Sequence, residues 1–595
     1  MKKLKSIVAL SLTFSVLISC LFSVAATSSV EDVLTVEEKI TSELKEQYAL
    51  ADGDEVIALV WFSDIDMSAA EAAALKSTGM TKAKLESYEV ADPLAASDQV
   101  LAEQDDEIQA YIEAKRAAAR ELYTDYNQKL ADELLSGTEV FYISRYSPVV
   151  LAKLSENSAM TIAEHPKIQM ISYYSNDVIS EDFTRASSPV ISIDTANTIN
   201  KVNAVHTSSN YGYTGKGVKI GVFESGFPDT TKFGNLNIQK KVSNGPNIEV
   251  KNHASMVLDI VSNVAPNAEY YLGASHEPKY DMQTVEDLLD LGVNVIISCI
   301  SFNSFNDYCQ YSTSEKWLDH IAYQHDVHYV LAAGNSGGGS VPGIKQGPCP
   351  GAMAYNVISV GNIDTKGTLG YSDDLIHSMS SYYSGSNLAY KPDICAPGTS
   401  LYSRFENEGV TGTSFAAPQV AGVIALMCEQ RPALKTQQTS VKAILTAGVN
   451  FESPHRYTPS NANYKKYGAG LLDCVGACYV AGNYRYTNSS IASGTTSKTH
   501  TFTVNSSDSR IRVSLAFNVK SSGSGTDHGT ITTGSKLDLN IQVKDPSGRV
   551  VGSSTTKNNN VEIVDFVPTT TGKYSVVVSR ADTSAETVYY GLAWR

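Results

Sequence analysis

The spacing of hydrophobic and polar positions divides the chain into regions of different structural type. In the first region, an apolar run at residues 55–62 predicts a strand, and residues 98–135 continue without Gly or Pro, as expected of a long exposed helix. Residues 140–175 follow with a strand, a short helix and a second strand. We therefore expect residues 27–190 to form an α+β domain, which ends in an exposed polar linker at residues 175–189.

Residues 191–482 show a different pattern, in which short apolar runs alternate with amphipathic stretches. KIGVF at 219–223, NVIISCI at 294–300 and HYVLAA at 328–333 are typical of buried strands, and residues 253–265 carry apolar positions at helical spacing. Strands that alternate with helices in this way predict an α/β domain with a parallel sheet flanked by helices.

Residues 483–595 are rich in Ser, Thr, Gly and Asn and lack a helical period. Alternating runs such as HTFTV at 500–504 and KYSVVVS at 573–579 predict strands that bury one face. We expect an all-β domain here, a sandwich or a jelly roll.

Length and charge narrow the classes of function. A chain of 595 residues is too long for one hydrophobic core, which agrees with a multi-domain protein. The hydrophobic content of 42% is that of a folded globular protein, and the net charge of −16 disfavours nucleic acid and anionic membranes as partners.

Residues 1–26 have the form of an export signal. Three lysines precede a long apolar stretch, and small residues at its end suit cleavage near Ala26. An uncleaved membrane anchor and lipid attachment at Cys20 are the alternatives, but apolar residues continue past Cys20. We expect a secreted mature chain with no transmembrane anchor.

Seven cysteines remain once Cys20 is lost with the signal, so at least one thiol is free. Cysteines inside apolar runs suit buried hydrophobic positions, whereas those in loop-like surroundings suit disulfides whose pairing the sequence leaves open. The first group is Cys299, Cys395 and Cys428, and the second is Cys309, Cys349, Cys474 and Cys478. Their spacing does not suggest zinc, and we assign no metal ligands.

A carboxylate, an imidazole, an amide and a hydroxyl occur where strands end or helices begin in the α/β region. Glu224 ends a predicted strand, His253 begins a helix, Asn335 follows a strand, and Ser414 begins an apolar helix. Because functional residues gather at the carboxyl ends of parallel strands, we expect these four at one edge of the sheet. The plainer alternatives are a helix N-cap for Ser414 and a turn residue for Asn335.

Together these four groups have the chemistry that acyl transfer to a serine requires. His253 is the expected general base for the nucleophile Ser414, and Glu224 is expected to orient the imidazole. Asn335 and the Ser414 main-chain N–H are expected to stabilise the oxyanion. The other histidines of the region lie in helix or strand runs, and we expect most of them at the surface.

The sequence around these residues resembles the subtilase (subtilisin-like) serine peptidases. GTSFAAPQVAG around Ser414 matches the nucleophile motif of that family nearly throughout, AAGN at 332–335 matches the oxyanion segment, and the four functional residues occur in the family's order. The resemblance covers residues 200–480. It implies a serine endopeptidase that acts on protein or peptide substrates without a required cofactor. Structural calcium is frequent in the family, and its presence here is left open.

The chain departs from the family pattern at the carboxylate residue and in the three residues after the histidine. Glu224 stands where the family has Asp, and Ala254, Ser255 and Met256 follow the histidine where the family has Gly-Thr-His. A glutamate still offers a carboxylate to the imidazole. Asp229 is a poorer candidate because it lies in the loop beyond the strand.

The expected substrate-binding residues also depart from the pattern. Cys299, Ile300 and Ser301 take the place of the Ser-Leu-Gly edge strand with which the family pairs substrate backbone. Ala333 and Gly334, in the oxyanion segment, complete the expected set. The specificity of the pocket is therefore not predictable from the family.

Residues 140–175 resemble the second half of the inhibitory propeptides of this family. The resemblance implies that residues 27–190 assist folding and block the cleft, as an intramolecular inhibitor, until they are cut off near 175–200. The all-β region resembles the small domain that trails many secreted bacterial peptidases. Two other functions remain open: a catalytically weak subtilase-fold binding protein and a surface adhesin whose β domain binds.

Overall fold

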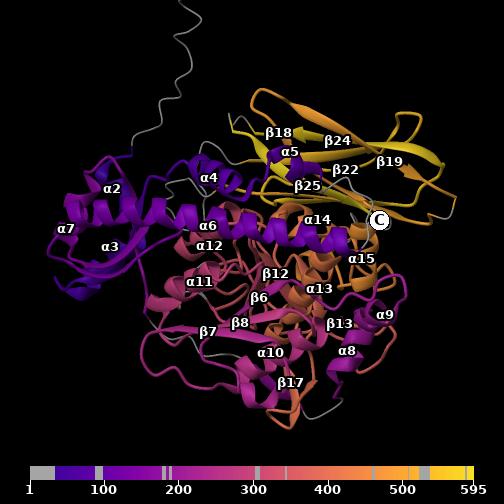
Figure 1. The fold of residues 1–595 in the computed structure, drawn as a ribbon, viewed down its shortest axis with the longest axis horizontal. Helices are drawn as coiled ribbons and strands as arrows, with labels where there is room; N and C mark the ends of the chain where they lie inside the picture. The colour runs from indigo at the N-terminus through magenta and orange to yellow at the C-terminus, as the bar shows by residue number, and fades with distance from the viewer. Residues whose placement is uncertain are drawn as a thin grey trace, which may run out of the picture.

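The computed structural model describes residues 34–87, 98–176, 183–186, 190–301, 308–341, 345–457, 462–506, 508–520, 537–582 and 586–595. The predicted signal at residues 1–26 lies outside the described residues. The chain builds an N-terminal region, a central region and a C-terminal region, which follow the colour bar from indigo to yellow (Figure 1).

The N-terminal region contains a four-stranded antiparallel sheet in the order β2-β3-β1-β4. One face of this sheet packs against α3 and α7 in a core of its own. The predicted long helix is α6, Asp98–Leu134, and it crosses the front of the molecule (Figure 1). The other elements are α2 Val36–Lys39, α3 Ser42–Ala51, β1 Val56–Phe62, α4 Ser68–Thr78, α5 Lys82–Ser87, β2 Glu139–Ile143, β3 Val149–Leu154, α7 Glu156–Ala163 and β4 Ile168–Tyr173.

The central region contains the predicted parallel sheet, in the order β13-β12-β10-β9-β6-β8-β7 with β15 beside β12. All the pairs are parallel except that of β12 with β13. Side chains alternate between its faces, so that Ile220 and Val222 pack with α10 and α13, whereas Phe223 packs with α11 and α12. The strands are β6 Lys219–Glu224, β7 Ile238–Asn244, β8 Glu269–Ser275, β9 Val295–Ser298, β10 His328–Ala332, β12 Ile358–Asp364, β13 Leu375–Ile376 and β15 Ile394–Pro397.

The helices and a small sheet complete the central region. Strand β5, Thr184–Ala186, joins β16 Leu401–Ser403 and β17 Glu408–Thr411 in a three-stranded sheet. The helices are α8 Ile193–Ile199, α9 Val202–Thr207, α10 Asn252–Val264, α11 Asp281–Asp290, α12 Thr313–Gln324, α13 Ala417–Gln430, α14 Gln438–Ala447 and α15 Cys474–Gly482.

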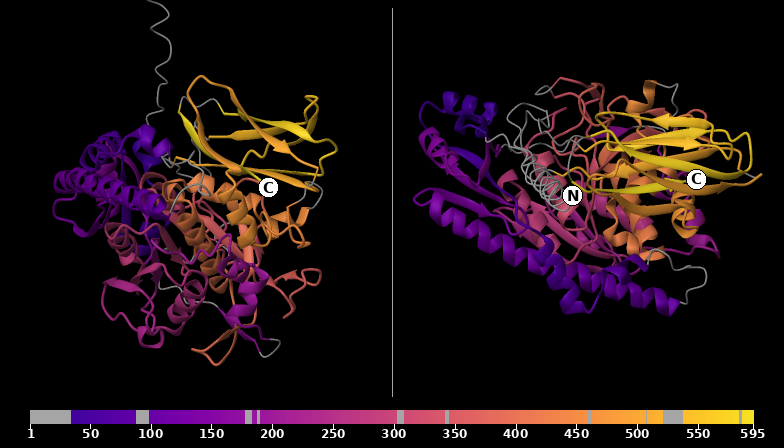
Figure 2. Two further views of the ribbon diagram at one scale, coloured as in Figure 1. Left: turned by 45° about the vertical axis from the view of Figure 1, so that its right-hand side comes forward. Right: turned by 90° about the horizontal axis from the view of Figure 1, so that it is seen from above.

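The C-terminal region is rich in strands, as predicted. Its two four-stranded sheets, in the orders β18-β25-β20-β23 and β19-β24-β21-β22, share one hydrophobic core. They lie on the side of the molecule away from α10 and β17 (Figures 1 and 2). The strands are β18 Tyr486–Ile491, β19 Ser497–Val504, β20 Ile511–Phe517, β21 Leu539–Lys544, β22 Val550–Ser554, β23 Val561–Phe566, β24 Gly572–Arg580 and β25 Val588–Trp594.

The N-terminal region packs against the central region in two places. The second face of its sheet shares a core with α11 and α12, to which Trp61 and Tyr146 contribute fully buried rings. Helix α6 runs along one side of the central region (Figure 2) and inserts Arg116, whose guanidinium donates to the carbonyls of Val293 and His325 at 2.7 and 2.9 Å. These acceptors lie before β9 and β10, at the sheet edge opposite to the one where those strands end.

This packing explains why the predicted surface position of the histidines is wrong. His320, His325 and His328 are buried and not surface residues. The rings of Tyr123 and Tyr146, from the N-terminal region, cover the first two. A part of the chain that lies far away in the sequence therefore removes the imidazoles of His320 and His325 from water.

The seven cysteines outside the signal are all free and buried. Those in loop-like surroundings are as buried as those in apolar runs, and the structure contains no disulfide between any of the seven. Among the helices of the described residues, none is both long and apolar enough to cross a membrane.

Candidate active site

Glu224 and His253 meet at the carboxyl edge of the central sheet. Strand β6 ends at Glu224, and α10 places His253 in its first turn. His253 Nδ1 lies 2.8 Å from Glu224 Oε2, and the two residues are 3% and 1% exposed. A carboxylate at this distance accepts from Nδ1–H, and Nε2 is then the nitrogen that can accept a proton.

Ser414 lies in a 3₁₀ turn, Thr413–Phe415, just before α13. Its Oγ donates to the carbonyl of Cys299 at 3.5 Å, and the Cys299 thiol donates to the Ser414 carbonyl at 3.4 Å. The ring of Phe415, the next residue, lies 5.9 Å from the His253 imidazole. The residue at the N-cap of α13 is Ala416, so the plainer alternative of an N-cap serine does not describe Ser414.

Asn335 is fixed beside the same turn. Its Oδ1 accepts from the Thr413 main-chain N–H at 2.9 Å and from the Thr413 hydroxyl at 3.2 Å. These bonds turn Nδ2 toward Gly412, where an added Cβ would approach it to 3.3 Å. A carboxylate, an imidazole, a hydroxyl and an amide donor thus lie at one edge of the sheet, where the sequence predicts them.

Comparison with known proteins gives this arrangement a family. The model of the "Subtilase family" matches residues 215–470, which carry Glu224, His253, Asn335 and Ser414. The central region is a subtilisin-like serine peptidase domain.

Two relatives and one solved structure show how far the similarity extends. Subtilisin DY of Bacillus licheniformis is 28% identical over 40% of this chain and 85% of its own length. Serine protease AprX of Bacillus subtilis is 31% identical over 26% of this chain, but only 35% of its own length is covered. Fervidolysin from Fervidobacterium pennivorans matches 87% of this chain and 85% of its own, with a TM-score of 0.44 and 12% identity.

The departures beside His253 have structural roles in this subtilase domain. Ser255 donates through Oγ to the Lys251 carbonyl at 2.9 Å and accepts from the Asp229 main-chain N–H at 2.8 Å. The Asp229 carboxylate accepts from Thr231, which lowers its pKa. The carboxylate that contacts the imidazole therefore belongs to Glu224 and not to Asp229.

The predicted substrate-binding residues of the domain lie on either side of Ser414. The main-chain groups of Ala333 bond to Val360 and Cys349, and the Gly334 N–H donates to the Thr413 hydroxyl. Ile300 packs partly buried against the core under α11 and α12. Cys299 contacts Ser414 as described, and Ser301 precedes residues outside the described ranges. Their part in substrate binding stays a prediction.

One residue of the site was missed from the sequence. Phe183, in the predicted exposed linker, lies with its ring 5.9 Å from that of His253 and 5.8 Å from that of Phe415. Residues Thr184–Ala186, which follow it, pair with β17 and are not a free linker. A lone aromatic residue in a polar stretch was the only signal in the sequence.

No three His, Cys, Asp or Glu side chains come together within the described ranges in a way that suits a metal ion.

Proposed function

We propose that the protein is a secreted serine endopeptidase that hydrolyses peptide bonds through an acyl-enzyme on Ser414. The observation that carries this proposal is the 2.8 Å contact of His253 Nδ1 with the buried Glu224 carboxylate. The His253 ring also lies 5.9 Å from the ring of Phe415, which belongs to the turn that carries Ser414. A binding protein or an adhesin has no use for this arrangement.

In the proposed mechanism, His253 Nε2 takes the proton of Ser414 while Oγ attacks the substrate carbonyl carbon. Glu224 holds the ring in one tautomer and stabilises the imidazolium that forms. The oxyanion accepts from the Ser414 main-chain N–H and from Asn335 Nδ2. His253 then returns the proton to the leaving amine, the C–N bond breaks, and water attacks the acyl-enzyme by the same steps.

We further propose that the protein is made as an autoinhibited precursor. Residues 1–26 act as the export signal, 27–190 as the propeptide, 191–482 as the catalytic domain and 483–595 as a β-sandwich. Support for an inhibitory propeptide comes from the position of the N-terminal sheet, which packs on α11 and α12 through a shared core. From there the chain runs on to Phe183, which lies against His253.

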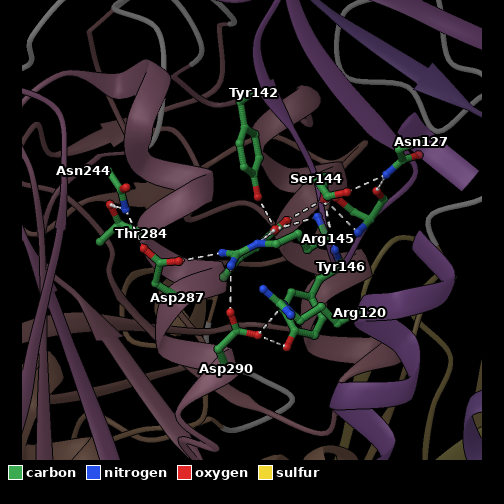
Figure 3. A network of polar contacts seen from close by, with 12 residues as sticks. Arg120, Asn127, Tyr142, Ser144, Arg145, Tyr146, Asn244, Thr284, Asp287 and Asp290 are labelled. Carbon is green, nitrogen blue, oxygen red and sulfur yellow. Dashed lines mark hydrogen bonds and ion pairs between the residues drawn. The ribbon is translucent and has the colours of Figure 1, made fainter. Parts of the chain in front are cut away.

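A polar network at α11 supports the same view (Figure 3). The buried Glu286 carboxylate accepts from Tyr142, from the Ser144 hydroxyl at 2.5 Å and from the Arg145 main-chain N–H at 2.8 Å. The Arg145 guanidinium also forms ion pairs of 2.6 and 2.7 Å with two further carboxylates of α11, Asp287 and Asp290. The N-terminal region thus satisfies an acidic helix face that would otherwise face water.

The purified precursor provides the test. It is incubated with and without a serine-directed phosphonate, and mass spectrometry reads the new N-terminus and the residue that the phosphonate labels. We expect a cut between residues 175 and 200 and labelling of Ser414. A precursor that hydrolyses peptides normally after Ser414→Ala would overturn the proposal.

A further inference from the structure

Strand β5 occupies a defined position beside the catalytic centre. It pairs antiparallel with β17, which leads through Gly412 into Ser414. The register sets Thr184 opposite Thr411, Arg185 opposite Val410 and Ala186 opposite Gly409. Chain direction follows from this pairing: residues after Phe183 run away from the serine, and Phe183 itself lies next to Gly412.

Phe183 lies inside the catalytic centre. A Cβ added to Gly412 would lie 3.6 Å from the Phe183 Cβ and 3.3 Å from Asn335 Nδ2. The phenyl ring also lies 5.9 Å from the His253 imidazole. Because the residues after Phe183 run away from Ser414 along β17, we take the bond on the amino side of Phe183 as the one that is cut, which makes Phe183 the first residue on the leaving side.

Arg185 extends this arrangement to a pair of acidic residues. Side chains two apart on a strand share a face, and the Arg185 guanidinium lies 5.6 Å from the centre of the Phe183 ring. It forms ion pairs of 2.7 Å with both Glu406 and Glu408. The guanidinium is 57% exposed, so each pair alone is weak, but two carboxylates meet on one cation.

Glu406 is fixed independently of Arg185. Its Oε1 accepts from the Asn252 side chain at 3.0 Å, and its main-chain N–H donates to the Ser403 hydroxyl at 3.3 Å. Asn252 is the residue before His253, so Glu406 belongs to the rim of the catalytic centre. The hydrogen bond from Arg185 lowers the pKa of Glu406, which keeps the carboxylate charged.

We propose that Glu406 and Glu408 form a subsite that selects a basic side chain at the third position after the cleaved bond. The chain's own segment Phe183–Ala186 is its first occupant, and the cut falls on the amino side of Phe183, so that residues 183–190 stay with the catalytic domain after cleavage. Once that bond is broken, the segment can leave β17, and the leaving side of a substrate peptide pairs there in its place. This inference rests on the proposed endopeptidase function.

Quenched fluorescent peptides test the subsite on the protein after its own cleavage. Three peptides share the residues before the bond and continue as Phe-Thr-Arg-Ala, Phe-Thr-Gln-Ala or Phe-Thr-Glu-Ala. Two exposed ion pairs predict kcat/KM about fivefold to tenfold higher with Arg than with Gln, and lower again with Glu. Because salt screens exposed charges, the preference should shrink at about 1 M salt.

Matched variants separate the subsite from general effects of charge. The double variant Glu406→Gln, Glu408→Gln should lose the preference for Arg, so that its kcat/KM values for the Arg and Gln peptides become equal. Glu452→Gln, which removes a 72% exposed carboxylate outside this sheet, should keep the preference. Mass spectrometry of the matured protein should give Phe183 as the new N-terminus.

The outcomes distinguish the two proposals. Equal kcat/KM for the three peptides in the unaltered protein, or a mature N-terminus other than Phe183, overturns the subsite and leaves the endopeptidase in place. If no peptide is hydrolysed in a Ser414-dependent way, the proposed function itself fails.

Discussion

The N-terminal and C-terminal regions both pack on the subtilase domain, but they do so with different kinds of contact. The N-terminal region meets charged and titratable groups, and burial there raises the pKa of Glu286 to about 7 and lowers that of His320. The C-terminal region mostly meets main-chain carbonyls: Arg512 donates to those of Ala469 and Tyr457, each at 2.9 Å. Contacts with carbonyls, which Arg116 also makes in the N-terminal region, do not change with pH, whereas the contacts of Glu286 and His320 do.

Both regions share a hydrophobic core with the subtilase domain, the N-terminal region under α11 and α12 and the C-terminal region at α13 and α14. Tyr486, Ala516 and Val561 of the C-terminal region belong to the same hydrophobic cluster as α13 and α14 of the subtilase domain. Arg595, at the end of the chain, donates to the carbonyls of Gly448 and Val449. We therefore expect the C-terminal region to stay with the folded enzyme, whereas the N-terminal region, although it shares a core with α11 and α12, also depends on charged contacts that a change of pH can weaken.

The substitution with the largest expected effect prevents the cleavage that would release the N-terminal region. Ser414→Ala should lower kcat by about 10⁶-fold, the order of the loss known for this change in a subtilisin. The N-terminal region should then stay joined to the rest of the chain, which gel electrophoresis and peptide hydrolysis measure together. Thermal unfolding of the precursor should not change, because the substitution removes one small hydroxyl.

Glu224→Ala should cost about 10⁴-fold in kcat, since an imidazole without its carboxylate loses its tautomer and its charge stabilisation. Glu224→Asp keeps the carboxylate on a shorter side chain and should lose much less. Peptide hydrolysis by the two variants is compared at equal folded concentration. Equal and undiminished rates in both would show that Glu224 does not orient His253.

Arg512→Ala tests how strongly the contacts of the C-terminal region stabilise the folded protein. This buried guanidinium also pairs with Asp565 at 2.8 Å, and its removal leaves a buried carboxylate without this partner. We expect a loss of about 3–5 kcal/mol in the free energy of unfolding, measured by denaturant in a Ser414→Ala background. Arg549→Ala, which removes a 65% exposed guanidinium paired with Asp545, is the matched control and should cost less than about 1 kcal/mol.

In otherwise unaltered protein, Arg512→Ala should leave kcat per folded molecule unchanged. A fall in kcat with normal stability would mean that the C-terminal region acts on the catalytic centre, and the comparison would fail.

The sequence predicts the parts of this molecule that short segments specify. The strand end at Glu224, the helix that begins at His253 and the turn at Ser414 are each determined by a few neighbouring residues and by the rule that functional groups gather at carboxyl ends of strands. The burial of His320 and the position of Phe183 depend on which distant segment covers them. No local pattern carries that information, so the prediction of a surface position for His320 is wrong, and the linker prediction for residues 175–189 misses the contact of Phe183 with His253.

Asn335→Leu should remove about 2.7–4 kcal/mol of transition-state stabilisation, which lowers kcat about 100- to 1,000-fold with little change in KM. Thr413→Val keeps the amide of Asn335 and removes only one of its two anchoring contacts, so it should lose less. A rise in KM with normal kcat in Asn335→Leu would place the amide in substrate binding instead. Neither substitution should change the contribution that the C-terminal region makes to the free energy of unfolding.

The smallest expected effect concerns the contact between α11 and the N-terminal region. Burial raises the pKa of Glu286 from its usual 4.5 to about 7, so this carboxyl is more easily protonated when the region is bound. Its contribution to binding is therefore fully present below about pH 4.5 and is lost as the pH rises through about 7. His320 and Lys316 have lowered pKa values at the same contact and act in the opposite direction.

Glu286→Gln isolates this contribution, because the histidines and Lys316 are the same in both proteins. The Ser414→Ala precursor receives a site-specific protease sequence between Asn176 and Phe183, is cut there, and is passed over a sizing column from pH 5 to pH 8. The unaltered contact should weaken over this range relative to the Gln variant, by up to about a hundredfold in the dissociation constant. Coincident pH curves would mean that Glu286 does not titrate at the contact. The reversible character that we assign to the N-terminal region would then have to rest on the histidines alone.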